Sequence, residues 1–318
     1  MFAARGIAIS FSVFVIVYGV LSLAVCLTWR KVWRYRQRYP VRWIANLLFA
    51  LRMSPLATAA VITLAVTVPS FLWLEPRAID ESMGAIPLAL SVGGAALGIF
   101  GVLNMGMAVR RTERAISVWI RKAQPVEATA ALPVLRLSSA VPAIVAAGIV
   151  RPRILLSAAA ESALTPRELE SALNHEAAHV RRQDNLKKLL LRLVTFPGMR
   201  GLEAAWLEAS EIAADDAAVS NAAEALDLAA ALIKLSRLPP ATSSADLATA
   251  LLPGASPASV VNARVERLLA WNERRTRPLR NYSPWYGLAA AAATVVVFSV
   301  TYSQLLVHVH TATEWLVR

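Results

Sequence analysis

The chain has 318 residues, 57% of them hydrophobic, and its mean hydropathy is +0.51. A chain this apolar is not an ordinary soluble protein, so membrane spans are the first feature to look for. The net charge of +12 leaves two classes of partner open, nucleic acid and the surface of a membrane.

Four apolar stretches are each long enough to cross a bilayer, which takes about 20 residues. They cover about residues 7–29, 55–74, 86–109 and 285–309. The apolar core of the first stretch is longer than the ~7–15 residues of a signal peptide, so we predict an uncleaved anchor.

These spans divide the chain into three parts. Residues 1–109 form a predicted membrane domain with three spans, and residues 110–283 are enough for one soluble domain. Residues 284–318 hold the fourth span and a short extracytoplasmic tail.

Lysine and arginine in the short flanks of the spans predict the orientation. The connection between the first two spans is strongly basic, whereas residues 75–84 carry Arg77 against three acidic residues. Further basic clusters lie at 110–114 and 274–280, on either side of the soluble domain. This domain is therefore expected in the cytoplasm, and the positive charge is expected to meet the lipid bilayer rather than nucleic acid.

The soluble domain is predicted to begin with strands. Residues 133–157 contain short β-branched runs broken by Pro142, Gly148 and Pro152, which is typical of about three short strands. The last of them, Arg153–Ser157, has two interpretations. It is either an edge strand with which an extended substrate pairs, or an ordinary core strand.

Helices follow the strands. Thr165, Pro166 and Glu168 match a capping box with proline at the first helical position, and they predict a helix from about 166 to 195. Pro197–Gly198 ends this helix. An alanine-rich helix is expected over 202–220, a loop with a short helix over 236–259, and another helix over 260–272.

The first of these helices contains the motif His-Glu-Ala-Ala-His. Residues four apart lie on one face of a helix, so His175 and His179 can bind one metal ion together. Glu176 points elsewhere and can act as a general base on a water that the metal activates. This is the arrangement of zinc peptidases, and the simpler alternative is a helix with two incidental histidines.

A catalytic zinc site has three protein ligands and one open position. The soluble domain holds no third histidine and no cysteine, so the third ligand is expected to be a carboxylate. Glu211 is the first candidate and Glu208, one turn earlier, is the alternative. Asp215, one turn after Glu211, is expected to accept a hydrogen bond from a ligating histidine. Asp184 is expected to support the site by orienting Arg181 or Arg182, or by holding the helix end.

Three runs together resemble a known family: "GIVRPRILLS", "LNHEAAHVRRQDN" and "EIAADDAAV". They are similar to the bacterial membrane metallopeptidases of the BlaR/MecR type, the beta-lactam sensor-transducers. The resemblance covers about Ala131 to Val219 and extends to the order of the spans. The E-x-x-A-D element is also similar to the ligand motif of the heat-shock membrane protease HtpX and of the CAAX-prenyl proteases.

The resemblance implies zinc at His175, His179 and Glu211, with Glu176 as the catalytic base. It also implies the bacterial inner membrane as the location, with the catalytic domain facing the cytoplasm. The expected fold is therefore four transmembrane helices with a cytoplasmic α+β, zincin-like (gluzincin) metallopeptidase domain.

One departure from the family concerns the sensor. The beta-lactam sensors carry an extracellular penicillin-binding domain after the fourth span, whereas here residues 310–318 follow it. We therefore expect a signal to come through the spans, the outer loop 75–84 or a partner.

The leading hypothesis is an integral-membrane zinc endopeptidase that cleaves a cytoplasmic protein. The resemblance implies that this substrate is a DNA-binding transcriptional repressor in a signalling pathway. One alternative is a quality-control protease similar to HtpX, and another is a non-catalytic membrane signalling scaffold.

Overall fold

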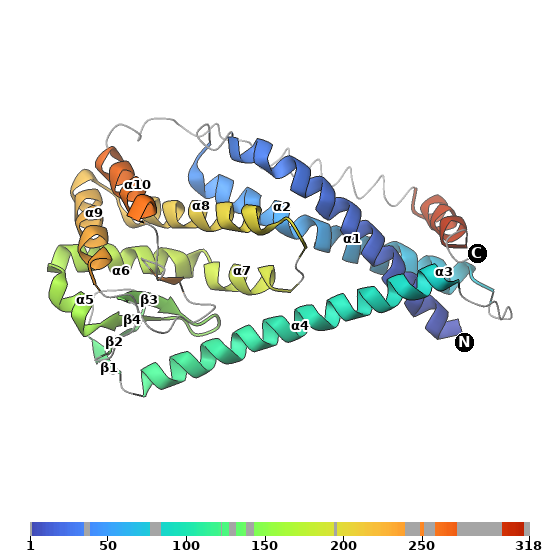
Figure 1. Cartoon of the computed structure of the whole chain (residues 1–318), viewed down its shortest axis with the longest axis horizontal. Coiled ribbons are helices and arrows are strands. Elements are labelled where there is room, and N and C mark those ends of the chain that lie inside the picture. Colours follow the sequence, from blue (N-terminus) through green and yellow to red (C-terminus); the bar gives the residue numbers. More distant parts are fainter. Residues whose placement is uncertain are drawn as a thin grey trace.

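The computed structural model describes residues 2–34, 39–76, 84–121, 123–126, 132–137, 143–193, 196–238, 249–250, 258–271 and 301–314. Long helices run side by side along most of the molecule, and a small sheet with several shorter helices lies at one end (Figure 1). The structure thus combines a helical rod with a compact mixed α and β part.

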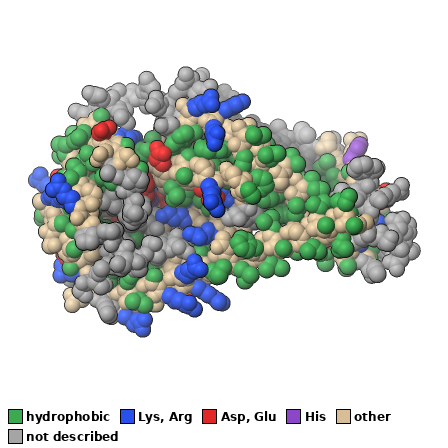
Figure 2. Space-filling model, viewed as in Figure 1, with side chains coloured by type: hydrophobic (Ala, Val, Ile, Leu, Met, Phe, Trp, Pro, Cys, Tyr) green, Lys and Arg blue, Asp and Glu red, His purple; other side chains and the backbone are tan. Residues whose placement is uncertain are grey.

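Three helical segments of the rod are long and apolar enough to cross a membrane: α1 (Phe2–Arg34), the segment Val41–Leu74, and α4 (Ala85–Ile120). The middle segment consists of α2 (Val41–Ile62), a π-helical turn (Thr63–Thr67) and α3 (Val68–Leu74). The surface of the rod away from the sheet is mostly hydrophobic, whereas lysines and arginines gather nearer the compact end (Figure 2). The rod therefore matches the first three predicted spans.

Most of the fourth predicted span, residues 285–300, lies outside the described residues. Residues 301–314 form a helix that packs beside the middle segment. There, Tyr302 donates a hydrogen bond to the carbonyl of Ala65 at 2.7 Å, and Ser70 donates one to the carbonyl of Leu306 at 2.9 Å. The last described helix is thus attached to the same bundle.

Within the described residues, the sheet has five strands in the order β1-β2-β4-β3-β5. β2 and β4 are parallel and the other pairs are antiparallel. The strands are β1 (Gln124–Val126), β2 (Val134–Leu137), β3 (Ile144–Ala147), β4 (Arg153–Ser157) and β5 (Thr249–Ala250).

The position of β4 corrects one interpretation of the sequence. Arg153–Ser157 is not an edge strand, because it pairs with β2 on one side and with β3 on the other. Ile154, Leu155 and Leu156 are each at most 1% exposed, so both faces of the strand are covered. A substrate cannot add to a strand whose backbone groups are already paired.

The described residues form six helices beside the sheet: α5 (Ala158–Ala163), α6 (Pro166–Arg181), α7 (Asp184–Leu191), α8 (Arg200–Ala218), α9 (Ala222–Ser236) and α10 (Ala258–Leu269). On one face, Ile154 and Leu156 join a buried cluster with Leu173 of α6 and Leu228 of α9. On the other face, Leu155 packs against Trp119 at the end of α4. The sheet is therefore covered by α6 and α9 on one face and by α4 on the other.

The predicted helix over 166–195 is two helices instead of one. Gln183 has a left-handed backbone with φ 56°, which ends α6 and turns the chain into α7. A left-handed residue cannot continue a right-handed helix. The break redirects Asp184 toward the residues of α6, and the sequence carries no proline or glycine there to announce it.

Candidate metal centre

A well-formed start fixes the position of α6. The Thr165 hydroxyl accepts a hydrogen bond from the Glu168 N–H, and the Glu168 carboxylate accepts one from the Thr165 N–H at 2.8 Å. Lys234 of α9 also donates to this carboxylate at 2.7 Å. The capping box fixes where α6 begins. His175 and His179 lie on the face of this helix that meets Glu211 of α8.

The two histidine rings approach each other at their Nε2 atoms, which are 3.1 Å apart. Each Nδ1 faces a carboxylate: His175 Nδ1 lies 2.9 Å from Asp215 Oδ1, and His179 Nδ1 lies 2.8 Å from Asp184 Oδ2. Both rings are at most 1% exposed.

This pairing determines what the Nε2 atoms offer. An ionised carboxylate accepts but does not donate, so a proton on each Nδ1 is favoured, and a ring that is then neutral presents a lone pair on Nε2. Two lone pairs at 3.1 Å repel each other, and a cation between them, a proton or a metal ion, removes the repulsion. The arrangement fits a metal ion held by both histidines, with each ring oriented by an acidic residue.

Glu211 of α8 completes the group. Its Oε2 lies 3.6 Å from His175 Nε2, and its Oε1 lies 3.5 Å from His179 Nε2. Zinc–ligand distances of ~2.1 Å in a tetrahedron place ligand atoms roughly 3.4 Å apart. The three side chains therefore have the spacing of a three-ligand metal site.

Glu208, the alternative ligand, is exposed on α8 and does not belong to this group.

Glu176 is completely buried beside the histidines. Its Oε2 accepts a hydrogen bond of 2.8 Å from the backbone N–H of Ala146 in β3, which ties the α6 motif to the sheet. Burial raises the pKa of Glu176 to about 8, and the nearby charge of Glu211 contributes to the increase. A carboxyl group with a raised pKa beside a metal site is suited to accept a proton.

The acidic residues around the histidines are held as carboxylates. Burial alone would raise the pKa of Glu211, but electrostatic attraction to His179, a hydrogen bond to His175 and the charge of Arg264 together lower it to about 2. Similar contacts lower the pKa of Asp215 below its usual range. Both groups are therefore negatively charged at neutral pH.

Asp184 has a different main partner from the one expected. The sequence indicated Arg181 or Arg182, and Arg182 does lie 3.4 Å from Asp184. The shorter contact, however, is the one to His179, which becomes possible because the chain turns at Gln183.

Two residues of the centre were not predicted from the sequence. Asn185 donates hydrogen bonds of 3.1 Å to the carbonyls of Ala146 and Gly148, which holds the end of β3 against α7. Arg264 of α10 contacts both Asp215 and Glu211. Asn185 closes the run that begins at Leu173 but offered no sign of its role, whereas Arg264 belongs to no motif and reaches the site from a distant segment.

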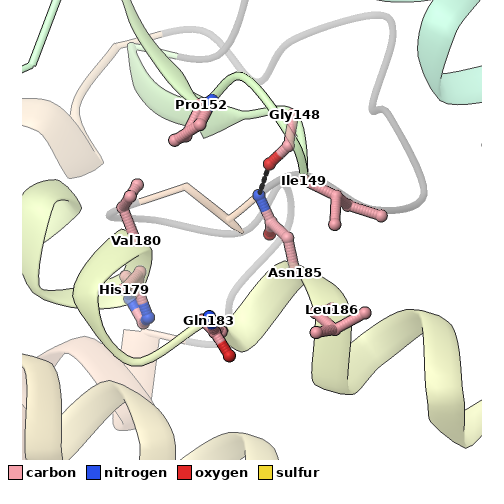
Figure 3. Close-up of a pocket in the computed structure, with 8 residues that line it drawn as sticks. All are labelled: Gly148, Ile149, Pro152, His179, Val180, Gln183, Asn185 and Leu186. Carbon is pink, nitrogen blue, oxygen red and sulfur yellow. Dashed lines mark hydrogen bonds between the residues drawn. The ribbon is translucent and has the colours of Figure 1, made fainter.

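A pocket of about 170 Å³ adjoins His179 (Figure 3). It is lined by Gly148, Ile149, Pro152, His179, Val180, Gln183, Asn185 and Leu186. Small-molecule sites usually measure roughly 300–1,000 Å³, so this pocket has room for a single side chain rather than a whole ligand.

Comparison with known proteins gives the family of this chain. The family model described as BlaR1 peptidase M56 matches residues 7–266, which run from the first predicted span to α10. A search of curated proteins gives no match. The matched segment includes the histidines, Glu176, Glu211 and both supporting aspartates, and it covers most of the chain. The chain therefore belongs to the BlaR1 peptidase M56 family.

Proposed function

We propose that this protein is an integral-membrane, zinc-dependent endopeptidase that cleaves a cytoplasmic protein. The observation that supports the proposal most directly is the approach of the two histidine Nε2 atoms to 3.1 Å, with an acidic residue on each Nδ1 and Glu211 facing both. A buried cluster with two facing lone pairs and a carboxylate matches zinc, which takes nitrogen and oxygen ligands.

His175, His179 and Glu211 would hold the ion, and Asp215 and Asp184 keep the two rings oriented toward it. Zinc bound there would polarise a peptide carbonyl and lower the pKa of a water toward ~7. Glu176 would take a proton from that water on one carboxylate oxygen and pass it to the leaving amine. The hydrogen bond from the Ala146 N–H fixes its other oxygen.

The pocket beside His179 would select the substrate. Ile149, Pro152, Val180 and Leu186 make most of its wall apolar (Figure 3). Because the pocket reaches His179 itself, a side chain seated in it would lie next to the bond being cleaved. An apolar side chain near the cleavage site is therefore the preference that we propose.

The proposed location rests on the span flanks. The basic residues of 30–52 and 110–114 support a compact end on the cytoplasmic side of a bacterial inner membrane. For the substrate we propose a DNA-binding repressor in a signalling pathway. A quality-control protease with many substrates and a non-catalytic scaffold are the alternatives that the experiment must separate.

The experiment compares new protein N-termini in cells that carry the wild type, Glu176→Gln, or Glu170→Gln. Glu170 is an exposed residue of the same helix and serves as the matched control. One or two fragments that disappear only with Glu176→Gln would support a dedicated signalling protease. Many lost fragments from membrane proteins would favour quality control instead.

The zinc content of the purified wild type distinguishes the proposed enzyme from the other alternative, a non-catalytic scaffold. A protein without bound zinc whose cells show the same fragments as the Glu176→Gln cells is a scaffold, and that result would refute the proposal.

A further inference from the structure

Arg264 of α10 links two of the acidic residues of the metal centre. Its Nε and Nη2 lie 2.8 Å and 2.6 Å from the two carboxylate oxygens of Asp215, which is a bidentate pair. Its Nη1 lies 3.2 Å from Glu211 Oε2. One guanidinium therefore spans two carboxylates that stand four residues apart on α8.

These contacts continue to the histidines. The oxygen of Asp215 that Arg264 Nη2 contacts, Oδ1, also contacts His175 Nδ1 at 2.9 Å. The oxygen of Glu211 that Arg264 contacts, Oε2, is the one nearest to His175 Nε2. Arg264 thus reaches the metal position by two routes: directly through Glu211, and through Asp215 and then His175.

Burial strengthens these ionic contacts. Arg264 is 4% exposed and Asp215 is 1% exposed, so water screens neither charge well. Two buried carboxylates on one helix face repel each other, and a buried charge without a counterion is costly. The guanidinium offsets the repulsion, and its rigid fork holds both carboxylates in one geometry.

We propose that Arg264 is a positioning residue of the metal centre: it sets the orientation of Glu211 as a ligand and of Asp215 as the partner of His175. The inference rests on the proposed zinc site. It makes α10, which no motif of the sequence marks, part of the centre.

A second ion pair provides the comparison that tests this role. Arg267, one turn further on α10, forms a bidentate pair with Asp216 of α8. It joins the same two helices, but its Asp216 partner is exposed and neither residue touches a histidine or Glu211 in the part of the chain that the structure describes. If Arg264 merely fastened α10 to α8, loss of either arginine would have a similar effect.

The experiment uses the full-length protein in detergent and measures zinc affinity by competition with a chromophoric chelator. The variants are Arg264→Gln, Arg264→Lys and the control Arg267→Gln. We expect Arg264→Gln to weaken zinc binding about 10–100-fold, the usual effect of losing a residue that supports a ligand. Arg267→Gln should stay within about threefold of the wild type.

Arg264→Lys should fall between these values, because an ammonium keeps the charge but cannot hold both carboxylates in a fork. The visible spectrum of the cobalt-substituted protein should also change in Arg264→Lys and stay unchanged in Arg267→Gln, because only the first alters the ligand geometry. This spectrum is read on folded, metal-loaded protein, so it tests the role even if Arg264→Gln does not fold.

Equal zinc affinity in Arg264→Gln and the wild type, equal losses in the two glutamine variants, or an unchanged cobalt spectrum in Arg264→Lys would each overturn the inference. A wild type that binds no zinc would refute the proposed function itself. The two failures are therefore distinguishable.

Discussion

Two aspartates perform the same task on the two histidines, although they come from different helices. Asp215 of α8 contacts His175, and Asp184 at the start of α7 contacts His179. Each is positioned to hold the proton of its ring on Nδ1, which would leave Nε2 for the proposed metal ion. The proposed chemistry of the centre therefore depends on these two residues as well as on the histidines themselves.

Substitution of Asp184 should therefore reach the metal through His179. We expect Asp184→Ala to reduce zinc affinity by about 10–100-fold, because the ring loses the carboxylate that orients it. Chelator competition on the purified protein measures the effect. Lys187→Met removes the 3.4 Å contact with the other Asp184 oxygen and leaves His179 in place, so it is the matched control. An affinity equal to that of the control would contradict the prediction.

The choice between Glu211 and Glu208 is also tested at single residues. Glu211→Gln should lower zinc affinity by at least about 10-fold, because it replaces the carboxylate that faces both histidines. Glu208→Gln should leave zinc binding unchanged, because Glu208 is exposed and outside the group. If the two variants exchanged these results, Glu208 would be the ligand and the helix register would be wrong.

At the scale of elements, α6 does most to place the centre. It begins at a capping box, carries the motif on its buried face, and ends at the left-handed Gln183. Its contacts with α8 bring Glu211 and Asp215 to the histidines, and its contact with β3 brings Glu176 to the Ala146 N–H. Substitutions at the start of α6, far from the histidines, should therefore lower the thermal stability of the protein more than its zinc affinity.

The pH dependence of stability tests the role of Glu168 at the start of α6. Burial alone would raise the pKa of Glu168, but hydrogen bonds from Lys234 and from Thr165 outweigh burial and lower it. The charged form of Glu168 is thus favoured in the folded protein. Its contribution to the free energy of unfolding is therefore present at neutral pH and is lost as the pH falls through the lowered pKa.

We therefore expect Glu168→Gln to melt at a lower temperature than the wild type at pH 7. The difference should shrink as the pH falls below the ordinary range of a glutamate, because the wild type then loses its charge as well. Thermal melts of both proteins from pH 7 downward measure this. A difference that is constant across the series would show that the ion pair with Lys234 contributes nothing.

At the scale of the whole molecule, polar contacts attach the compact end to the rod. Glu203 of α8 pairs with Arg52 of α2 at 2.8 Å, and Arg52 is only 2% exposed. Asn104 of α4 donates a hydrogen bond to the carbonyl of Arg192, next to the end of α7. The helices that carry the centre therefore contact the predicted spans directly, and a rearrangement of the spans has a short path to α7 and α8 (Figure 1).

The tightest of these contacts is at Gly101 of α4. A Cβ atom added there would lie 1.5 Å from the carbonyl oxygen of Leu193, so only glycine fits. We expect Gly101→Ala to push α4 away from Leu193, which follows α7, and to lower the melting temperature of the full-length protein.

Gly98 is the control for this prediction, because an added Cβ there meets no atom within 4 Å among the described residues. Alanine favours a helix over glycine by up to about 1 kcal/mol, so Gly98→Ala should be neutral or stabilising. Equal melting temperatures for the two variants would show that α4 and the Leu193 carbonyl do not pack as described.

Much of this protein follows from the sequence alone. The apolar stretches mark three helices long enough to span a membrane, the capping box marks the start of α6, and the spacing of His175 and His179 puts both on one helix face. The spacing of Glu211 and Asp215 likewise puts both carboxylates on one face of α8. These features are local, because the geometry of a helix relates residues within a turn or two.

The tertiary structure decided the rest. The turn at Gln183 brings Asp184 to His179, the sheet order puts β4 inside and β3 against Glu176, and α10 brings Arg264 to α8. Each of these contacts joins segments whose separation in the sequence follows no fixed period. Packing of the buried faces and pairing of buried charges select them, and neither can be read from the order of the residues.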